Sequence, residues 1–337
     1  MKELDELNEI TTKLSELGDL VRTEVIARSE GSSHSFPIHK ITFGTRDPRA
    51  PTLGLVGGVH GLERIGAQVC LALFKSLSEL TLWDETIQRT LENVRIFFIP
   101  LVNPVGIITK SRANPRGVDL MRNAPVEADS PPWLLGGHRI SPLLPWYRGV
   151  VGEGMEIESS ALVNAVRREG FQSRCLVTMD FHSGFGVRDR LWFPYAKTTK
   201  PYPGLAYAHS FKSLLERTYP HHFYEIEPQA KNYTTHGDIW DHLYDEYEIQ
   251  NGRGVYLPLC LEMGSWLWVK KNPLQIFSAD GPFNPVKRHR QQRILRRHNT
   301  LFDFMIRAIS SPDVWCSLGP EQKNKHELQA RDAWYGT

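Results

Sequence analysis

The feature that most constrains the fold of this chain is a series of short apolar runs that alternate with amphipathic segments. Each run has the length of a strand, and its uninterrupted apolar character is typical of a strand covered on both faces. The runs occupy 51–59, 94–104, 175–182 and 254–263. Segments with helical periodicity lie at 65–80, 158–169, 204–217 and 285–309. This alternation predicts an α/β fold: a single domain with a mixed, mostly parallel central sheet and helices on both faces.

The two ends of the chain differ from this central part. Apolar residues at helical spacing predict an opening helix over 3–28, and an alternating pattern predicts a strand over 36–44. We expect residues 1–45 to pack on the core of a main domain that spans 46–312. The polar composition of 313–337 predicts a C-terminal tail.

Charge, cysteines and the N-terminal sequence bound the class of protein. The formal net charge is +2, which is too small for the molecule as a whole to attract polyanions strongly. Four cysteines, none in a CxxC pair, predict buried free thiols in a reducing compartment. The N-terminus lacks the pattern of a signal peptide, and no apolar run approaches the ~20 residues that span a bilayer. We therefore expect a cytoplasmic protein without a membrane partner; the sequence does not indicate its oligomeric state.

The stretch "GGVHGLER" places two polar side chains directly after an apolar run. His60 and Glu63 follow the predicted strand and precede the predicted helix, where open α/β sheets bind their ligands. An imidazole and a carboxylate at this spacing can bind one zinc ion. Taken alone, the pattern is weak, because a capping Glu and a hydrogen-bonded core His are more frequent.

Two further polar residues end other apolar runs. His182, in "MDFHSG", can supply a third protein ligand and leave one coordination position open, as in catalytic zinc sites. Glu262, in "LCLEMGS", is a carboxylate in an apolar strand end, which is costly unless something compensates it. A metal-activated water nearby would give this carboxylate the role of a general base.

A short loop between these motifs is rich in arginine. The stretch "SRANPRGVDLMRN", residues 111–123, contains Arg112, Arg116, Asp119, Arg122 and Asn123. Guanidinium groups bind carboxylates in bidentate fashion and stabilise developing oxyanions. The alternative is a solvated surface loop, which is how most arginine-rich loops behave.

Taken together and in this order, the motifs from about residue 50 to residue 265 resemble the zinc carboxypeptidase (metallocarboxypeptidase) family. The resemblance implies a catalytic domain of that fold with one Zn²⁺ per chain. It also implies roles for individual residues, by the motif each one matches. The zinc ligands of the family are matched by His60, Glu63 and His182, and its general base is matched by Glu262. Arg112 matches the arginine that polarises the scissile carbonyl, and Arg122 matches the arginine that binds the terminal carboxylate of the substrate. Asp119 matches the carboxylate that orients the first zinc-binding histidine.

The same resemblance extends to the segment "NYTTHGDIWDHLY". Tyr233 matches the mobile tyrosine of the family, although a loop tyrosine that only packs its ring is an equal alternative. We group Asn123 with Arg122 and Tyr233 as substrate-binding residues. Met121 departs from the family pattern, which has Asn before the carboxylate-binding arginine, and Gly184 stands where an aromatic residue is common. Both departures concern substrate recognition.

The predicted reaction is hydrolysis of an amide bond next to a free carboxylate, in a peptide substrate. An alternative keeps the zinc site and changes the substrate to an N-acyl amino acid, as in the deacylase branch of the superfamily. A third hypothesis rests on "KRHRQQRILRRH", 287–298, which could bind nucleic acid or another polyanion. Apolar residues at helical spacing favour a solvated helix face instead, so a nucleic-acid partner is not expected.

Overall fold

The computed structural model describes residues 4–31, 35–250 and 254–336. One sheet of eight strands runs through the described chain, in the order β1-β2-β4-β3-β5-β8-β6-β7. The strands are β1 (Arg22–Glu30), β2 (Ser35–Gly44), β3 (Thr52–Gly57), β4 (Arg95–Ile99), β5 (Cys175–Ser183), β6 (Arg190–Phe193), β7 (Glu225–Pro228) and β8 (Val255–Met263). The pairs β4–β3, β3–β5, β5–β8 and β6–β7 are parallel, whereas β1–β2, β2–β4 and β6–β8 are antiparallel. The predicted mixed, mostly parallel sheet is confirmed.

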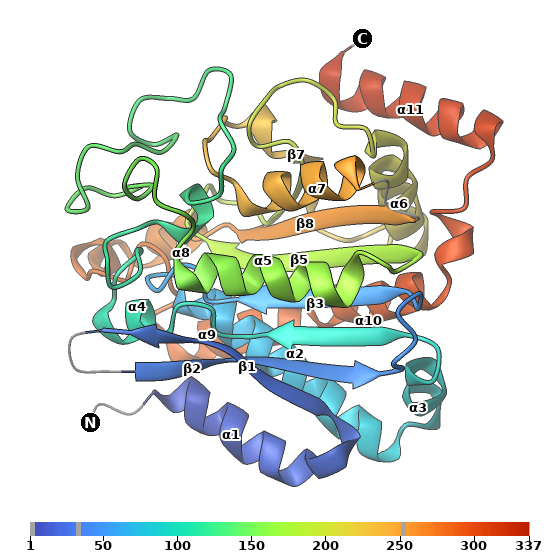
Figure 1. The fold of residues 1–337 in the computed structure, drawn as a ribbon, viewed down its shortest axis with the longest axis horizontal. Coiled ribbons are helices and arrows are strands. Elements are labelled where there is room, and N and C mark those ends of the chain that lie inside the picture. The colour runs from blue at the N-terminus through green and yellow to red at the C-terminus, as the bar shows by residue number, and fades with distance from the viewer. Residues whose placement is uncertain (1–3, 32–34, 251–253, 337) are drawn as a thin grey trace.

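Helices cover both faces of this sheet (Figure 1). The helices are α1 (Asp5–Leu17), α2 (Arg64–Trp83), α3 (Glu85–Leu91), α4 (Pro104–Thr109), α5 (Ile157–Gly170), α6 (Leu205–Thr218), α7 (Ile239–Ile249), α8 (Trp266–Lys271), α9 (Arg288–Arg297), α10 (Asn299–Ser310) and α11 (Pro320–Tyr335). In the view of Figure 1, α5 and α7 lie in front of the sheet, and α2, α9 and α10 lie behind it. The central strands β3, β4, β5 and β8 are buried along their whole length, as their continuous apolar runs predict.

Two predicted helices are wrong in extent. The opening helix ends at Leu17 instead of continuing to residue 28, because 22–30 forms the edge strand β1. The segment 285–309 forms two helices, α9 and α10, with a break at His298. The His298 side chain is buried and its Nδ1 lies 2.9 Å from the Tyr224 hydroxyl. The break between the two helices therefore coincides with a buried side-chain contact to the segment before β7.

The segment 313–337 is not the polar tail that its composition predicts. Most of it forms α11, which packs against α6. Ala330 and Trp334 are buried, and the Trp334 indole donates a hydrogen bond to the Ile226 carbonyl of β7. At the other end of the chain, α1, β1 and β2 belong to the same packed unit as the central strands. The predicted domain limits at residues 45 and 312 stay predictions.

One helix of the described chain, α2, is long and apolar enough to cross a membrane by length and composition. In this structure 61% of its most apolar 18-residue stretch is buried inside the protein, between the sheet and the neighbouring helices. A helix in a protein core meets the same criterion of length and composition, and α2 lies in the core of this protein.

Candidate active site

The polar residues of interest gather where the central parallel strands end. His60 and Glu63 lie in the turn between β3 and α2. His182 is the second-last residue of β5, and Glu262 is the second-last residue of β8. Gly58 has a φ of +67°, a conformation that favours glycine. A Cβ on Gly61 would lie 2.0 Å from the backbone of Gly106, so this turn requires glycine to pass beneath α4. The sequence therefore directs both polar side chains of this turn to the edge of the sheet.

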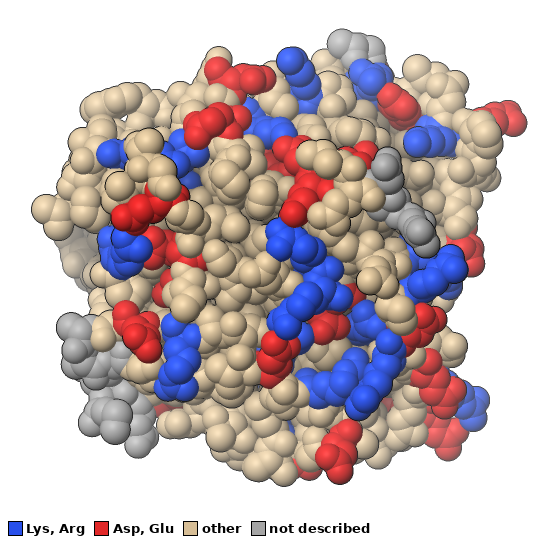
Figure 2. All heavy atoms as spheres, viewed as in Figure 1, with Lys and Arg blue, Asp and Glu red and all other residues tan. Residues whose placement is uncertain are grey.

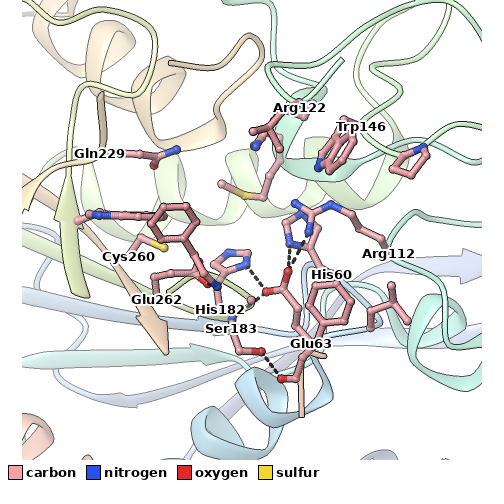
Figure 3. A pocket seen from close by; sticks show the side chains of 18 of the residues that line it. His60, Glu63, Arg112, Arg122, Trp146, His182, Ser183, Gln229, Cys260 and Glu262 are labelled. Carbon is pink, nitrogen blue, oxygen red and sulfur yellow. Dashed lines mark hydrogen bonds and ion pairs between the residues drawn. The ribbon is translucent and has the colours of Figure 1, made fainter. Parts of the chain in front are cut away.

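Three side chains from these elements converge on one point (Figure 3). The Nδ1 atom of His60 lies 2.9 Å from Glu63 Oε1, and the Nδ1 atom of His182 lies 3.0 Å from Glu63 Oε2. All three residues are buried, and one potential ligand atom of each lies within 4.8 Å of the other two. The structure thus brings together the three predicted metal ligands.

Each imidazole is held from behind by a second carboxylate. His60 Nε2 lies 2.9 Å from Asp119 Oδ1, and His182 Nε2 lies 2.7 Å from Asp180 Oδ2. Both carboxylates are buried. Carboxylates in this position fix the tautomer and the orientation of a metal-binding histidine. Asp180 was missed by the sequence analysis, although it stands two residues before His182 on the same strand and therefore on the same face.

The charges around the three residues favour an ionised Glu63. Burial opposes ionisation of Glu63, but the imidazoles of His60 and His182 outweigh this and hold its pKa well below the usual value. Burial likewise disfavours the imidazolium of His182, yet Asp180 and Glu63 raise its pKa well above normal. The Asp119 carboxylate is also buried, and Arg112 and His60 keep its pKa well below normal.

This donor set fits a zinc ion. Two imidazole nitrogens and one carboxylate form the protein part of a catalytic zinc site. The two Nδ1 atoms face Glu63 rather than the outer carboxylates, so the two nitrogens that would bind the metal and the Glu63 carboxylate border one space. Divalent zinc would also balance the carboxylates of Glu63, Asp119 and Asp180, all of which are buried beside it.

Glu262 lies next to this cluster with a different environment. It is the Cα partner of His182 across the β5–β8 pair, and its side chain is 8% exposed. Burial first, and then the nearby charge of Glu63, raise the pKa of Glu262 to about 8. The Phe185 backbone N–H donates to Glu262 Oε1 at 3.1 Å, which leaves Oε2 for another partner.

Arg112 connects the predicted metal ligands with the arginine-rich loop. Its Nη1 donates to Glu63 Oε1 at 2.9 Å, and its Nε donates to Asp119 Oδ2 at 2.8 Å. Burial lowers the pKa of this guanidinium, but the two carboxylates raise it by more, so it stays charged. The structure therefore places a fixed positive charge at the edge of the cluster.

A cavity of about 380 Å³ opens over these residues. Arg122 lines it from η2 (Leu120–Arg122) and is only 3% exposed, and its Nε has no hydrogen-bond partner among the described residues. The Tyr233 ring also lines this cavity, between Phe185 and Trp192. Burial raises the pKa of the Tyr233 hydroxyl, and the neighbouring Arg122 partly opposes this.

One predicted substrate-binding residue does not reach this cavity. The Asn123 amide donates to the Arg148 carbonyl and accepts from the Glu156 N–H, so both of its polar groups stabilise the loop. Its grouping with the substrate-binding residues is therefore corrected. Met121 and Gly184, the two departures from the family pattern, do line the cavity. Most other wall residues had no clear sequence signal, because such side chains are common everywhere. These additional wall residues include Leu62, Leu135, Pro145, Trp146, Trp192, Gln229, Asp238, Cys260 and Phe283.

Comparison with known proteins agrees with this arrangement. Residues 8–267 match the zinc carboxypeptidase family. This chain belongs to that family. Membership confirms the resemblance predicted from the motifs and supports a metallopeptidase-type hydrolase.

Curated relatives of this chain match over short stretches. Carboxypeptidase SOL1 of Arabidopsis thaliana is 31% identical over 97 residues, which are 28% of this chain and 20% of that protein. The carboxypeptidase N catalytic chain of Rattus norvegicus is 30% identical over 121 residues, or 32% of this chain and 26% of that protein. The matched part thus spans about a fifth to a quarter of these relatives.

Solved structures share the fold over most of this chain. The bovine thrombin-activatable fibrinolysis inhibitor, solved in complex with tick carboxypeptidase inhibitor, aligns with a TM-score of 0.63 at 19% identity, over 91% of this chain and 96% of that one. Carboxypeptidase A from Helicoverpa armigera aligns with a TM-score of 0.62 at 14% identity, over 90% of this chain and 71% of that one. At these identities the likeness concerns the fold alone, and it confirms the predicted fold class.

Proposed function

We propose that this protein is a zinc-dependent carboxypeptidase that cleaves an amide bond next to a free carboxylate. The observation that carries this proposal is the placement of Arg122 in the same cavity as His60, Glu63, His182 and Glu262. Arg122 is buried and its Nε has no hydrogen-bond partner among the described residues, and a substrate carboxylate suits such a guanidinium because it can bind in bidentate geometry.

The zinc ion would be held by His60, Glu63 and His182, where it would lower the pKa of a bound water and polarise the substrate carbonyl. Glu262 accepts a proton from the attacking water at Oε2, because Oε1 is occupied by the Phe185 N–H. It then delivers this proton to the leaving amine. The raised pKa of Glu262 suits a group that must take up and release a proton near neutral pH.

The two arginines divide the remaining work. Arg112 is fixed by Glu63 and Asp119, so its positive charge is already oriented toward the oxygen that becomes negative during the attack. Arg122 binds the terminal carboxylate and positions the scissile bond. Tyr233 closes the wall beside Arg122 and can donate its hydroxyl to the same carboxylate.

A second candidate substrate is an N-acyl amino acid, which also carries a free carboxylate. Met121 motivates this candidate, because it lines the cavity where the family pattern has Asn, so the recognition side of the site departs from that pattern. The two candidates share the zinc site and differ in what fills the rest of the cavity. The cytoplasmic location predicted from the sequence stays a prediction, as does the absence of a nucleic-acid partner.

Metal analysis combined with two substrate panels tests the proposal. The zinc-loaded protein is expected to release C-terminal residues from peptides and to spare the same peptides with amidated ends. Glu262→Gln is expected to keep zinc and lose turnover, whereas Glu246→Gln on the far end of α7 serves as a control that keeps both. Hydrolysis of N-acyl amino acids without peptide cleavage would favour the second candidate. A zinc-loaded protein that cleaves neither panel would refute the proposed activity.

A further inference from the structure

A surface beside the active site combines exposed apolar side chains with unpaired cations. It comprises α8, η4 (Pro273–Phe277), the loop that follows and α9, and we call it the 266–297 surface. Five large apolar side chains in this stretch are exposed: Trp266 (45%), Leu274 (77%), Ile276 (43%), Phe277 (86%) and Val286 (56%). Single exposed apolar side chains are ordinary, but a group of this kind marks an interaction site.

Most cations of this surface form no ion pair with a described carboxylate; Arg297, which pairs with Asp189, is the exception. Between Gly264 and His298 there are eight Lys or Arg residues and one acidic residue, Asp280, which pairs with Lys110 at 3.1 Å. Six of the eight are exposed and form no ion pair with any carboxylate in the part of the chain that the structure describes. These six are Lys270, Lys271, Lys287, Arg288, Arg293 and Arg296.

On the α5 side of the protein, in contrast, cationic and acidic side chains lie next to one another. Figure 2 shows Lys and Arg side chains over the α5 side of the molecule with Asp and Glu side chains among them. There Arg168 pairs with Glu24 at 2.9 Å, and the buried Lys40 beneath them pairs with Glu24 and Glu169 at 2.7 Å each. The helix α9 lies on the other side of the sheet (Figure 1). Its Arg297 pairs with Asp189 at 3.3 Å, whereas its other arginines pair with no carboxylate among the described residues.

The 266–297 surface is held firmly on the body of the protein. Ile294 of α9 is buried, and Gln291 donates to Gln68 of α2. Arg290 donates to the Lys271 carbonyl, which joins α9 to α8. At the near end, the Asn284 amide bonds the Leu62 carbonyl and the Ile65 N–H beside the metal-binding turn. The surface is therefore rigid and borders the mouth of the active site.

We propose that the 266–297 surface docks this protein on an anionic lipid membrane. Cations attract the negative headgroups, while Leu274 and Phe277 insert among the acyl chains, and two such signals together give stable peripheral binding. Nucleic acid is the less favoured partner, because aliphatic side chains such as Leu274, Ile276 and Val286 find no counterpart along a phosphate backbone. This proposal replaces the expectation, drawn from the sequence, that the protein has no membrane partner, and it does not depend on the proposed hydrolysis.

Sedimentation with lipid vesicles tests this docking. Vesicles of phosphatidylcholine with added phosphatidylserine are expected to bind about tenfold more protein than vesicles of phosphatidylcholine alone, and salt is expected to weaken this binding. The double variant Leu274→Ser/Phe277→Ser and the double variant Lys287→Gln/Arg288→Gln are each expected to reduce binding about tenfold. A matched control on α11, Lys325→Gln/Leu328→Ser, exchanges an exposed cation and an exposed apolar side chain outside this surface and is expected to bind normally.

All exchanged residues are exposed, so thermal melting is expected to show intact folding for each variant, and the charge variant alone still tests the proposal if the apolar variant unfolds. Vesicle binding that is absent, or that is the same for every variant, would overturn the proposal. Binding of a labelled oligonucleotide without vesicle binding would overturn it as well, and would assign the surface to nucleic acid.

Discussion

Trp240 donates its indole N–H to Asp180 Oδ2 over 3.0 Å, and the same oxygen lies 2.7 Å from His182 Nε2. Helix α7 thus supports a metal ligand on β5 through one carboxylate oxygen. Asp180 Oδ1 has no partner among the described residues, so the carboxylate has no other hydrogen bond to orient it. Trp240 is accordingly part of what positions His182.

We expect Trp240→Phe to weaken zinc binding by about tenfold, because loss of an outer hydrogen bond loosens the ligand that it supports. Competition with a chromogenic chelator measures this change. Trp133→Phe is a suitable control, because Trp133 is 82% exposed. Unchanged zinc affinity in Trp240→Phe would show that β5 alone orients His182.

Zinc is expected to stabilise the folded protein, because it binds a site that the unfolded chain lacks. The site is preorganised, since both imidazoles already contact Glu63 and a second carboxylate. Added zinc should raise the melting temperature of chelator-treated protein and leave that of His182→Ala unchanged. An equal rise in both proteins would place the stabilising zinc elsewhere.

Arg122→Met should reduce kcat/KM on peptides with a free C-terminus about 100-fold, since a buried charge pair with the substrate is worth roughly 3 kcal/mol. Arg293→Met, on the exposed face of α9, is the control for loss of a cation. If Arg122→Met loses no more activity than Arg293→Met, the substrate carboxylate binds at another place.

Met121→Asn tests whether the substrate carboxylate lies beside residue 121. Met121 lines the cavity together with Arg122, so an amide there adds a donor toward a terminal carboxylate. We expect a several-fold rise in kcat/KM for whichever substrate the protein cleaves, because peptides and N-acyl amino acids both carry this carboxylate. A fall in kcat/KM would indicate that the natural substrate requires an apolar wall at this position.

Stability is expected to fall at mildly acidic pH because of a histidine pair between α6 and α11. His209 Nδ1 lies 2.9 Å from His326 Nδ1. Burial, and then His326, lower the pKa of His209 to about 4. Between about pH 6.5 and pH 4 the unfolded chain binds a proton that folded His209 does not, so the free energy of unfolding decreases as the pH falls.

Because this histidine pair is partly open to solvent, we expect the free energy of unfolding to be lower by roughly 1 kcal/mol at about pH 5 than at neutral pH. Thermal melts at about pH 7.5 and about pH 5 should show a smaller difference for His209→Gln than for the unaltered protein. His221→Gln, an exposed histidine on the neighbouring loop, should behave like the unaltered protein. Equal pH responses of all three proteins would remove His209 from the acid sensitivity.

The sequence predicts those parts of the structure in which a residue pattern is compatible with only one kind of secondary structure and burial. The runs that contain β3, β4, β5 and β8 are mostly apolar, and a strand covered on both faces is the simplest way to bury them. The edge strand β1 was missed, because its side chains are mostly half-buried or exposed and resemble those of a surface helix. The strands β6 and β7 have four residues each, too few for a periodicity to appear.

The candidate site was predicted where motifs carry unusual residues in apolar surroundings. His60, Glu63, His182 and Glu262 stand at strand ends, where a polar side chain needs an explanation. Asn123 was misplaced because its neighbours along the chain suggest a role that its side-chain direction does not permit. Support from distant elements, such as Trp240 on α7, depends on tertiary packing that local patterns do not contain.

The pairing of β5 with β8 sets His182 opposite Glu262 in the middle of the sheet. A slip of one residue in this pair would bring Leu261 or Met263 to that position, and the side chains would point to opposite faces. The proposed base and one proposed metal ligand therefore come together only when β5 and β8 pair in this register. A chain in which these two strands are unpaired lacks the candidate active site, so its formation depends on the same backbone pairing that builds the centre of the sheet.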